Sequence, residues 1–227
     1  MRIRSFIIAY ALVLAILLFA DRRPHPAAEG HYSHIVDLTA GKSTIGKNAN
    51  AQIPPLSRTE IVAPGALIPG TWAAGEIPAE RLIAPLVVMD LNVAPPAQIS
   101  LDDIAAWEAK HGAVPQGAVV AIRLCATTDT RSGAATGTVS RSALPISAAA
   151  AQFLMDARYT TGFAIETSPD FAADHPLARQ IALHGNYVIE SAAHLATLPA
   201  SGSIIVVAPS KGKSSSPDQV RVLAMVR

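Results

Sequence analysis

Short apolar runs alternate with helix-like segments from residue 35 to the end of the chain, and this alternation restricts the fold more than any other feature. The apolar run Leu86–Leu91 is bounded by prolines and suits a strand buried on both faces. Ser100 and Ser147 each precede a segment of helical composition, which Gly112 ends in the first case. Further strands are expected at 35–38, 118–124, 163–166, 187–190, 204–208 and 220–226, and helices at 101–111, 148–158 and 176–184. The pattern predicts an α/β domain with a mixed β-sheet.

Composition limits the classes of function. With 227 residues, 50% of them hydrophobic, the chain can bury one sizeable core. Basic and acidic residues nearly balance, at 18 against 17, and aromatic residues make up only 5%. Neither a basic surface nor a set of stacking rings is therefore expected, and we predict no nucleic-acid partner. Cys125 is the single cysteine, which excludes an intrachain disulfide and a cysteine-based zinc cluster.

The N-terminus has the layout of an export signal. Arg2 and Arg4 precede an uninterrupted apolar run over residues 6–20, so residues 1–23 are predicted to be a signal anchor or a signal peptide. Fifteen helical residues cover only about 22 Å, less than the ~30 Å hydrocarbon core, and this favours a cleaved signal. Leu18 occupies a position where cleavage prefers a small residue, and this favours a retained anchor. The retained anchor is the interpretation that we adopt.

The charges beside the apolar run predict its orientation. The N-terminal amine with Arg2 and Arg4 slightly outweighs the basic residues on the other side, so the N-terminus is expected in the cytoplasm. The chain is then a single-pass protein of the bacterial inner membrane with a periplasmic domain. The alternative is a secreted or periplasmic protein after signal cleavage. Residues 24–34 are predicted to be a linker, and residues 35–227 the folded domain.

Several short strings of the domain occur in a characteristic order. They are Ile35–Thr39, Ile61–Pro64, Ile77–Pro85, Ser147–Leu154, Tyr187–Glu190 and Leu195–Pro199. In order and spacing this set resembles the cyclase family of metal-dependent hydrolases, to which bacterial kynurenine formamidases belong. The resemblance covers about residues 35 to 227 and implies a compact α/β domain, often dimeric or tetrameric. It also implies one or two zinc or manganese ions that activate water to open an amide, ester or lactone.

The family's metal site follows a pattern of the form H-x-G-T-H-x-D-x-P-x-H, to which Thr59 and Pro64 of this chain can be aligned. The aligned ligand positions hold Leu56, Glu60, Val62 and Ala66, a later histidine position holds Ala178, and Glu190 matches the family's carboxylate. The glycine position holds Arg58. Because Leu, Val and Ala offer no lone pair to a cation, the resemblance implies a degenerate site, and no cofactor is expected.

A different site could have been built in the same place. Glu60 and Glu190 could approach each other and hold a hard cation or share a proton. Each carboxylate could instead be neutralised locally, Glu60 by neighbouring Arg58 and Glu190 by backbone donors. Further candidate catalytic residues are His175, His184 and His194, although histidines are also common at helix ends and on surfaces.

Three functions remain open at this point. The first is a catalytically inactive relative of the family, tethered to the membrane as an accessory subunit that contacts a membrane complex through residues 5–20 and the domain surface; homo-oligomers are also possible. The second is a divergent metal-dependent hydrolase of an amide, ester or lactone, with a rebuilt zinc or manganese site. The third is a periplasmic binder of an apolar small molecule in the old pocket. The sequence favours the first.

Overall fold

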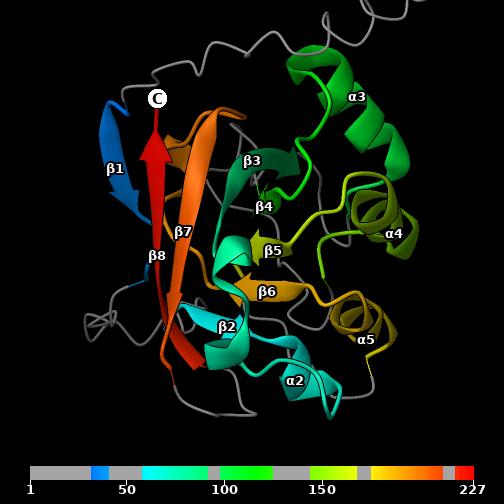
Figure 1. The fold of residues 1–227 in the computed structure, drawn as a ribbon. Coiled ribbons are helices and arrows are strands. Elements are labelled where there is room, and N and C mark those ends of the chain that lie inside the picture. Colours follow the sequence, from blue (N-terminus) through cyan, green and yellow to red (C-terminus); the bar gives the residue numbers. More distant parts are fainter. Residues whose placement is uncertain (1–31, 41–57, 92–97, 125–143, 168–174, 212–217) are drawn as a thin grey trace, which may run out of the picture. The chain divides into compact units, whose positions relative to one another are not determined.

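The computed structural model describes residues 32–40, 58–91, 98–124, 144–167, 175–211 and 218–227, which lie in one compact unit, Tyr32–Arg227 (Figure 1). The predicted anchor of residues 1–23, most of the linker, Leu56 and Cys125 lie outside the described residues. Within the described part, no helix is long and apolar enough to cross a membrane.

The described elements alternate much as the sequence predicts. The strands are β1 (His34–Asp37), β2 (Glu60–Val62), β3 (Ile83–Leu91), β4 (Val119–Leu124), β5 (Gly162–Ile165), β6 (Tyr187–Glu190), β7 (Ser203–Pro209) and β8 (Asp218–Val226). The α-helices are α2 (Pro64–Leu67), α3 (Leu101–His111), α4 (Ala148–Ala157) and α5 (Pro176–Leu183), and short 3₁₀ turns span Ala74–Glu76, Ala79–Arg81 and Leu195–Thr197.

Capping residues set the helix ends as expected. The Ser100 hydroxyl accepts a hydrogen bond from the Asp103 backbone N–H at 3.2 Å and begins α3. At the other end Gly112 adopts a φ of +86°, which favours glycine, and α3 stops there. Ser147 caps α4 in the same way as Ser100, since its hydroxyl accepts from the Ala150 N–H.

The sheet is mixed, as predicted, and it is also closed. Strands β3, β4, β5 and β6 run parallel, and each crossover between them contains one of the helices α3, α4 and α5. The sheet order is β1-β8-β2-β6-β5-β4-β3-β7, and β7 pairs again with β8. Within the described residues, seven strands thus form a closed barrel, and β1 pairs with β8 beside it.

Strand alternation divides the buried side chains into two cores. On β6, Tyr187 and Ile189 point into the barrel, whereas Val188 points to the helices. The second core lies between the parallel strands and α3, α4 and α5, which cover one side of the barrel (Figure 1). A residue's parity on its strand therefore determines whether it faces the barrel interior or the helices.

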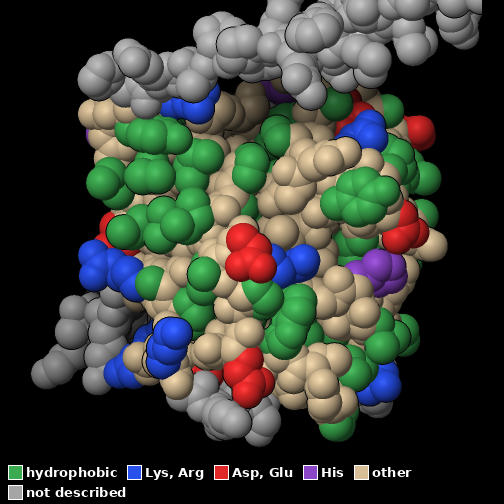
Figure 2. Space-filling model, viewed as in Figure 1, with side chains coloured by type: hydrophobic (Ala, Val, Ile, Leu, Met, Phe, Trp, Pro, Cys, Tyr) green, Lys and Arg blue, Asp and Glu red, His purple; other side chains and the backbone are tan. Residues whose placement is uncertain are grey.

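The outer surface of β1, β8, β7 and the start of β3 is apolar. Cross-strand partners form two rows on it: Ile35, Met225 and Ile204 in one, and Leu223, Val206 and Ile83 in the other. Ile35 is 63% exposed and Ile83 is 60% exposed. In Figure 2 hydrophobic side chains gather over β1, β7 and β8. We call these six residues the aliphatic face.

Candidate functional site

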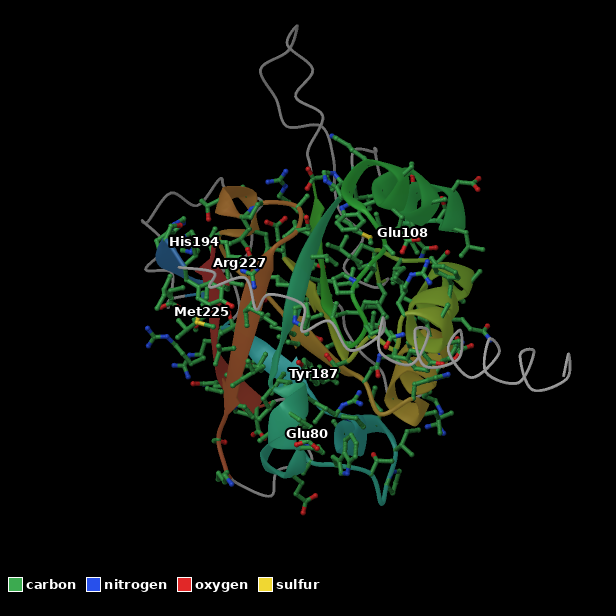
Figure 3. The ribbon with its side chains drawn as sticks, turned by 45° about the horizontal axis from the view of Figure 1, so that its top comes forward. Glu80, Glu108, Tyr187, His194, Met225 and Arg227 are labelled. Atoms are coloured by element: carbon green, nitrogen blue, oxygen red, sulfur yellow. The ribbon has the colours of Figure 1, made fainter. Side chains whose placement is uncertain are left out.

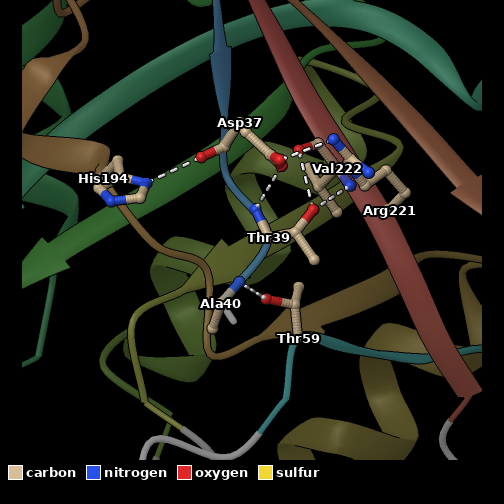
Figure 4. Close-up of polar contacts among 7 residues, drawn as sticks. All are labelled: Asp37, Thr39, Ala40, Thr59, His194, Arg221 and Val222. Atoms are coloured by element: carbon tan, nitrogen blue, oxygen red, sulfur yellow. Dashed lines mark hydrogen bonds and ion pairs between the residues drawn. The ribbon is translucent and has the colours of Figure 1, made fainter. Parts of the chain in front are cut away.

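Thr59 connects three separate segments at the start of the candidate site. Its side chain is buried, with 2% exposed. The hydroxyl donates to the Ser191 carbonyl at 2.8 Å and accepts from the Ala40 N–H at 2.7 Å (Figure 4). The Thr59 carbonyl also accepts from the Val220 N–H at 3.2 Å. The threonine of the family's pattern thus has a structural role that needs no metal.

The turn after β2 is fixed by backbone contacts. Pro64 occupies the first turn of α2, where its missing N–H costs no hydrogen bond. The Gly65 N–H donates to the Trp72 carbonyl at 2.8 Å. A Cβ on Gly65 would lie 2.8 Å from the same carbonyl oxygen, so this close approach requires glycine. The backbone contact between Gly65 and Trp72 therefore holds the segment from Thr59 to Trp72 in a closed turn.

Glu60 and Glu190 are direct cross-strand partners. Strands β2 and β6 pair antiparallel with Glu60 opposite Glu190 and Val62 opposite Val188. In such a pair the two Cβ atoms lie about 4.5–5.5 Å apart. Glu190 is 4% exposed, and Glu60 is half-buried. By strand parity both side chains share the helix-facing side of the sheet, at the carboxyl end of β6.

The register thus brings together the two carboxylates that the sequence singled out. Whether they hold a cation or share a proton stays a prediction. No ion pair joins Glu60 to Arg58, both of which the structure describes.

The other described ligand positions are parts of the hydrophobic core. Val62 is 3% exposed and Ala178 is 1% exposed, and both belong to one cluster with Val188. Ala66 packs against the same cluster. Within the described residues, no group of three or more His, Cys, Asp or Glu side chains could hold a metal ion. The residues present at these positions do not fit zinc or manganese, because a closed zinc site needs about four N, O or S ligands.

The three candidate histidines serve helix ends and the surface. His175 precedes α5, and its Nδ1 accepts from the Ala178 N–H at 3.3 Å. His184 ends the same helix and is exposed. His194 donates from Nδ1 to the Asp37 carbonyl at 2.8 Å (Figure 4). The structure therefore places none of these histidines beside another one in a common site.

Sequence reasoning missed the role of Arg81. Its Nη2 donates to the Gly185 carbonyl and to Asn186 Oδ1, each at 3.1 Å, and its guanidinium lies 5.4 Å from the Trp72 ring centre. The Tyr187 hydroxyl donates to the Arg81 carbonyl at 2.9 Å. Burial lowers the pKa of Arg81 and raises that of Tyr187 to about 12, so the phenol stays protonated at neutral pH.

These contacts anchor the strand that carries Glu190. Tyr187 begins β6 inside the barrel, whereas Glu80, next to Arg81, is exposed (Figure 3). The only sequence signal for Arg81 is its place in the Ile77–Pro85 string. That string identifies the residue without indicating its partners.

A closed mixed barrel with helices on one side, and a threonine-anchored turn beside a buried glutamate, define the fold and the candidate site of this α/β protein. The chain belongs to the Cyclase family: the family model described as "Putative cyclase" matches residues 20–170. The family expected from the sequence is thereby confirmed. A comparison with curated proteins finds no match.

Solved structures support the same fold. Isatin hydrolase A from Labrenzia aggregata, bound to benzyl benzoate, is 25% identical with a TM-score of 0.62, over 85% of this chain and 93% of that chain. Isatin hydrolase A from Ralstonia solanacearum is 22% identical with a TM-score of 0.63, over 96% and 97%. A potential metal-dependent hydrolase with cyclase activity is 22% identical with a TM-score of 0.61, over 86% and 98%. The similarity extends over nearly the full length of these proteins.

Proposed function

We propose that this chain is a cyclase-family protein without the family's metal-dependent hydrolase activity, which acts as a membrane-tethered binding subunit. One observation carries the proposal: Val62 and Ala178, at two ligand positions of the family pattern, are buried in one hydrophobic cluster. Their side chains supply packing where a hydrolase needs lone pairs. No cofactor is part of this function.

The tether is the apolar run of residues 6–20. With Arg2 and Arg4 on the cytoplasmic side, it holds the domain in the periplasm as a single-pass protein of the bacterial inner membrane. Small residues such as Ala9, Ala11 and Ala15 support close lateral packing against other helices. Cleavage after the run would instead release the domain into the periplasm.

The partner is another subunit of a membrane complex, and the aliphatic face supports this choice. Its six residues present a contiguous apolar surface, bordered by the Asp37–Arg221 ion pair, and an apolar centre with a polar rim is the property of a protein-contact surface. A second copy of the chain is the other candidate for this face. The balanced charge supports no nucleic-acid partner.

Metal content tests the catalytic half of the proposal. We expect the full chain, purified without chelator and dialysed, to hold less than about a tenth of an equivalent of zinc or manganese by plasma mass spectrometry, because about four ligands are needed. Glu190→Gln is expected to hold as little as the wild type. A stoichiometric ion that is lost in Glu190→Gln would contradict the proposal.

Co-purification from native membranes tests the binding half. We expect Ile35→Asp to weaken recovery of a defined membrane partner about tenfold or more, because a charge would be buried within the contact. Leu183→Asp is the matched control, since Leu183 is an equally exposed aliphatic residue, at 67%, on α5. Equal recovery with both variants would rule out the aliphatic face as the contact.

The alternative function is a divergent hydrolase, and the register of Glu60 opposite Glu190 favours it. Two carboxylates at this distance could act as an acid and base pair on an amide, ester or lactone. Isatin hydrolases have the same fold, so a cyclic amide is the first substrate class to assay. Under this alternative, Glu60→Gln abolishes turnover.

A further inference from the structure

A hollow of about 330 Å³ lies where β8 passes from β2 to β1, and its lining includes Thr59, the neighbour of ligand position Glu60, but no ligand position itself. Thr39, Ala40, Thr59 and Val220 form its wall. Two arginines, Arg58 and Arg221, line the same hollow, and both are exposed. The polar atoms of the wall bond one another, as in the contact between Ala40 and Thr59 (Figure 4).

The strand register places the two arginines opposite each other. Glu60 pairs with Gln219 on β8, and the Val220 N–H donates to the Thr59 carbonyl at 3.2 Å. Continuing this antiparallel register from Glu60 by two positions, past Thr59 and Val220, puts Arg58 opposite Arg221. Like charges directly opposite each other on a sheet are destabilising. The arrangement therefore favours negative charge close to the two guanidinium groups.

Only one of the two arginines has a carboxylate partner among the described residues. Arg221 lies 2.8 Å from Asp37 Oδ2, and Asp37 Oδ1 accepts from the Thr39 N–H at 3.0 Å (Figure 4). Burial acts to raise the pKa of Asp37, but these contacts outweigh it, so the pKa lies below its usual value and Asp37 is ionised at neutral pH. Within the described residues, Arg58 forms no ion pair.

Glu60, two residues from Arg58, forms no ion pair with it, and the segments that flank the hollow contain no acidic residue. Residues 41–57, which join Ala40 to Arg58, contain Lys42 and Lys47 and no Asp or Glu. The segment before β8 likewise contains Lys213 without an acidic residue. The sequence on both sides of the hollow is thus basic.

We propose that Arg58 and Arg221 bind a small oxyanion, a phosphate or carboxylate group, in this hollow. Guanidinium forks donate two parallel hydrogen bonds to such groups, and an anion between them removes the repulsion of the like charges. One edge of the Arg221 guanidinium group keeps its contact with Asp37, and the other edge binds the anion. The site is independent of the proposed binding function, and its ligand is a free anion or a lipid headgroup.

Phosphate titration of the full chain in phosphatidylcholine nanodiscs tests the proposal. At constant ionic strength, inorganic phosphate is expected to bind the wild type at least about tenfold more tightly than Arg58→Gln, by isothermal calorimetry, because a charge-assisted hydrogen bond is lost. Arg227→Gln removes the same charge from an exposed arginine that stacks over Tyr32, and it should bind phosphate as the wild type does.

Nanodiscs of different lipid composition distinguish the two sources of the anion, a lipid headgroup and a free anion. If phosphatidylglycerol in the nanodiscs weakens phosphate binding in the wild type but not in Arg58→Gln, a headgroup occupies the site. If it does not, the site takes a free anion, and acetate in place of phosphate then shows whether a carboxylate suffices. Equal phosphate affinity of the wild type and Arg58→Gln would overturn the proposal. So would a loss of thermal stability in Arg58→Gln without phosphate, since relief of repulsion predicts none.

Discussion

The substitution Gly162→Ala is expected to destabilise the domain by about 3 kcal/mol, the upper end of the range for overpacked cores. Gly162 begins β5, and a Cβ there would lie 2.6 Å from Tyr187 Cε2 and 2.8 Å from the Tyr187 carbonyl oxygen. The ring cannot move away, because it is fully buried and its hydroxyl bonds to the Arg81 carbonyl. Chemical denaturation followed by circular dichroism measures the loss.

Two further variants separate the steric clash from the mere loss of a glycine. A Cβ on Gly202 meets nothing within 4 Å, so Gly202→Ala should cost only the left-handed backbone strain, about 1 kcal/mol. In Gly162→Ala combined with Tyr187→Leu, the cost should be below the sum of the single costs, because the clash with the ring is removed while the contact with the backbone carbonyl of residue 187 remains. Additive costs, or a Gly162→Ala cost no larger than that of Gly202→Ala, would refute the steric account.

The capped helices and buried strands could be predicted from the sequence because their signals are local. Ser100 and Gly112 delimit α3 by their own backbone preferences, and the apolar residues 86–89 of β3 need no partner to be recognised as part of a buried strand. Strand β2 was not predicted, because three residues are too few to show alternation. Closure of the barrel was also missed, since it depends on the long-range pairing of β8 with β2 and β7.

The candidate site was predictable only in part, for a similar reason. The resemblance identified Glu60, Val62 and Ala178 as ligand positions, yet their convergence on one face follows from strand register and helix packing. The opposition of Arg58 and Arg221 is likewise a matter of register between distant segments. The sequence of a strand does not show which residues of another strand lie opposite it. The residues at the ligand positions could therefore be identified from the sequence, but which residues lie side by side could not.

Restoring the family's ligand types is expected to convert the domain into a zinc protein. The triple variant Glu60→His, Val62→Asp and Ala178→His adds three ligands beside Glu190. Without metal, the carboxylate at position 62 is buried in an apolar cluster, which should cost several kcal/mol of stability. Zinc should restore that stability and bind at about one equivalent, because metal binding adds its free energy to folding. Thermal unfolding with and without zinc, and metal content, measure both effects.

The matched control moves one histidine by a helical turn. Ala182 lies on α5 four residues after Ala178, is 2% exposed and belongs to the same cluster. Glu60→His and Val62→Asp with Ala182→His should therefore be destabilised to a similar extent, yet zinc should rescue it far less. If zinc rescues both triple variants equally, the positions no longer have the geometry of a metal site. If it rescues only the variant at position 178, the scaffold retains the site, and the absence of lone pairs alone accounts for the loss of metal.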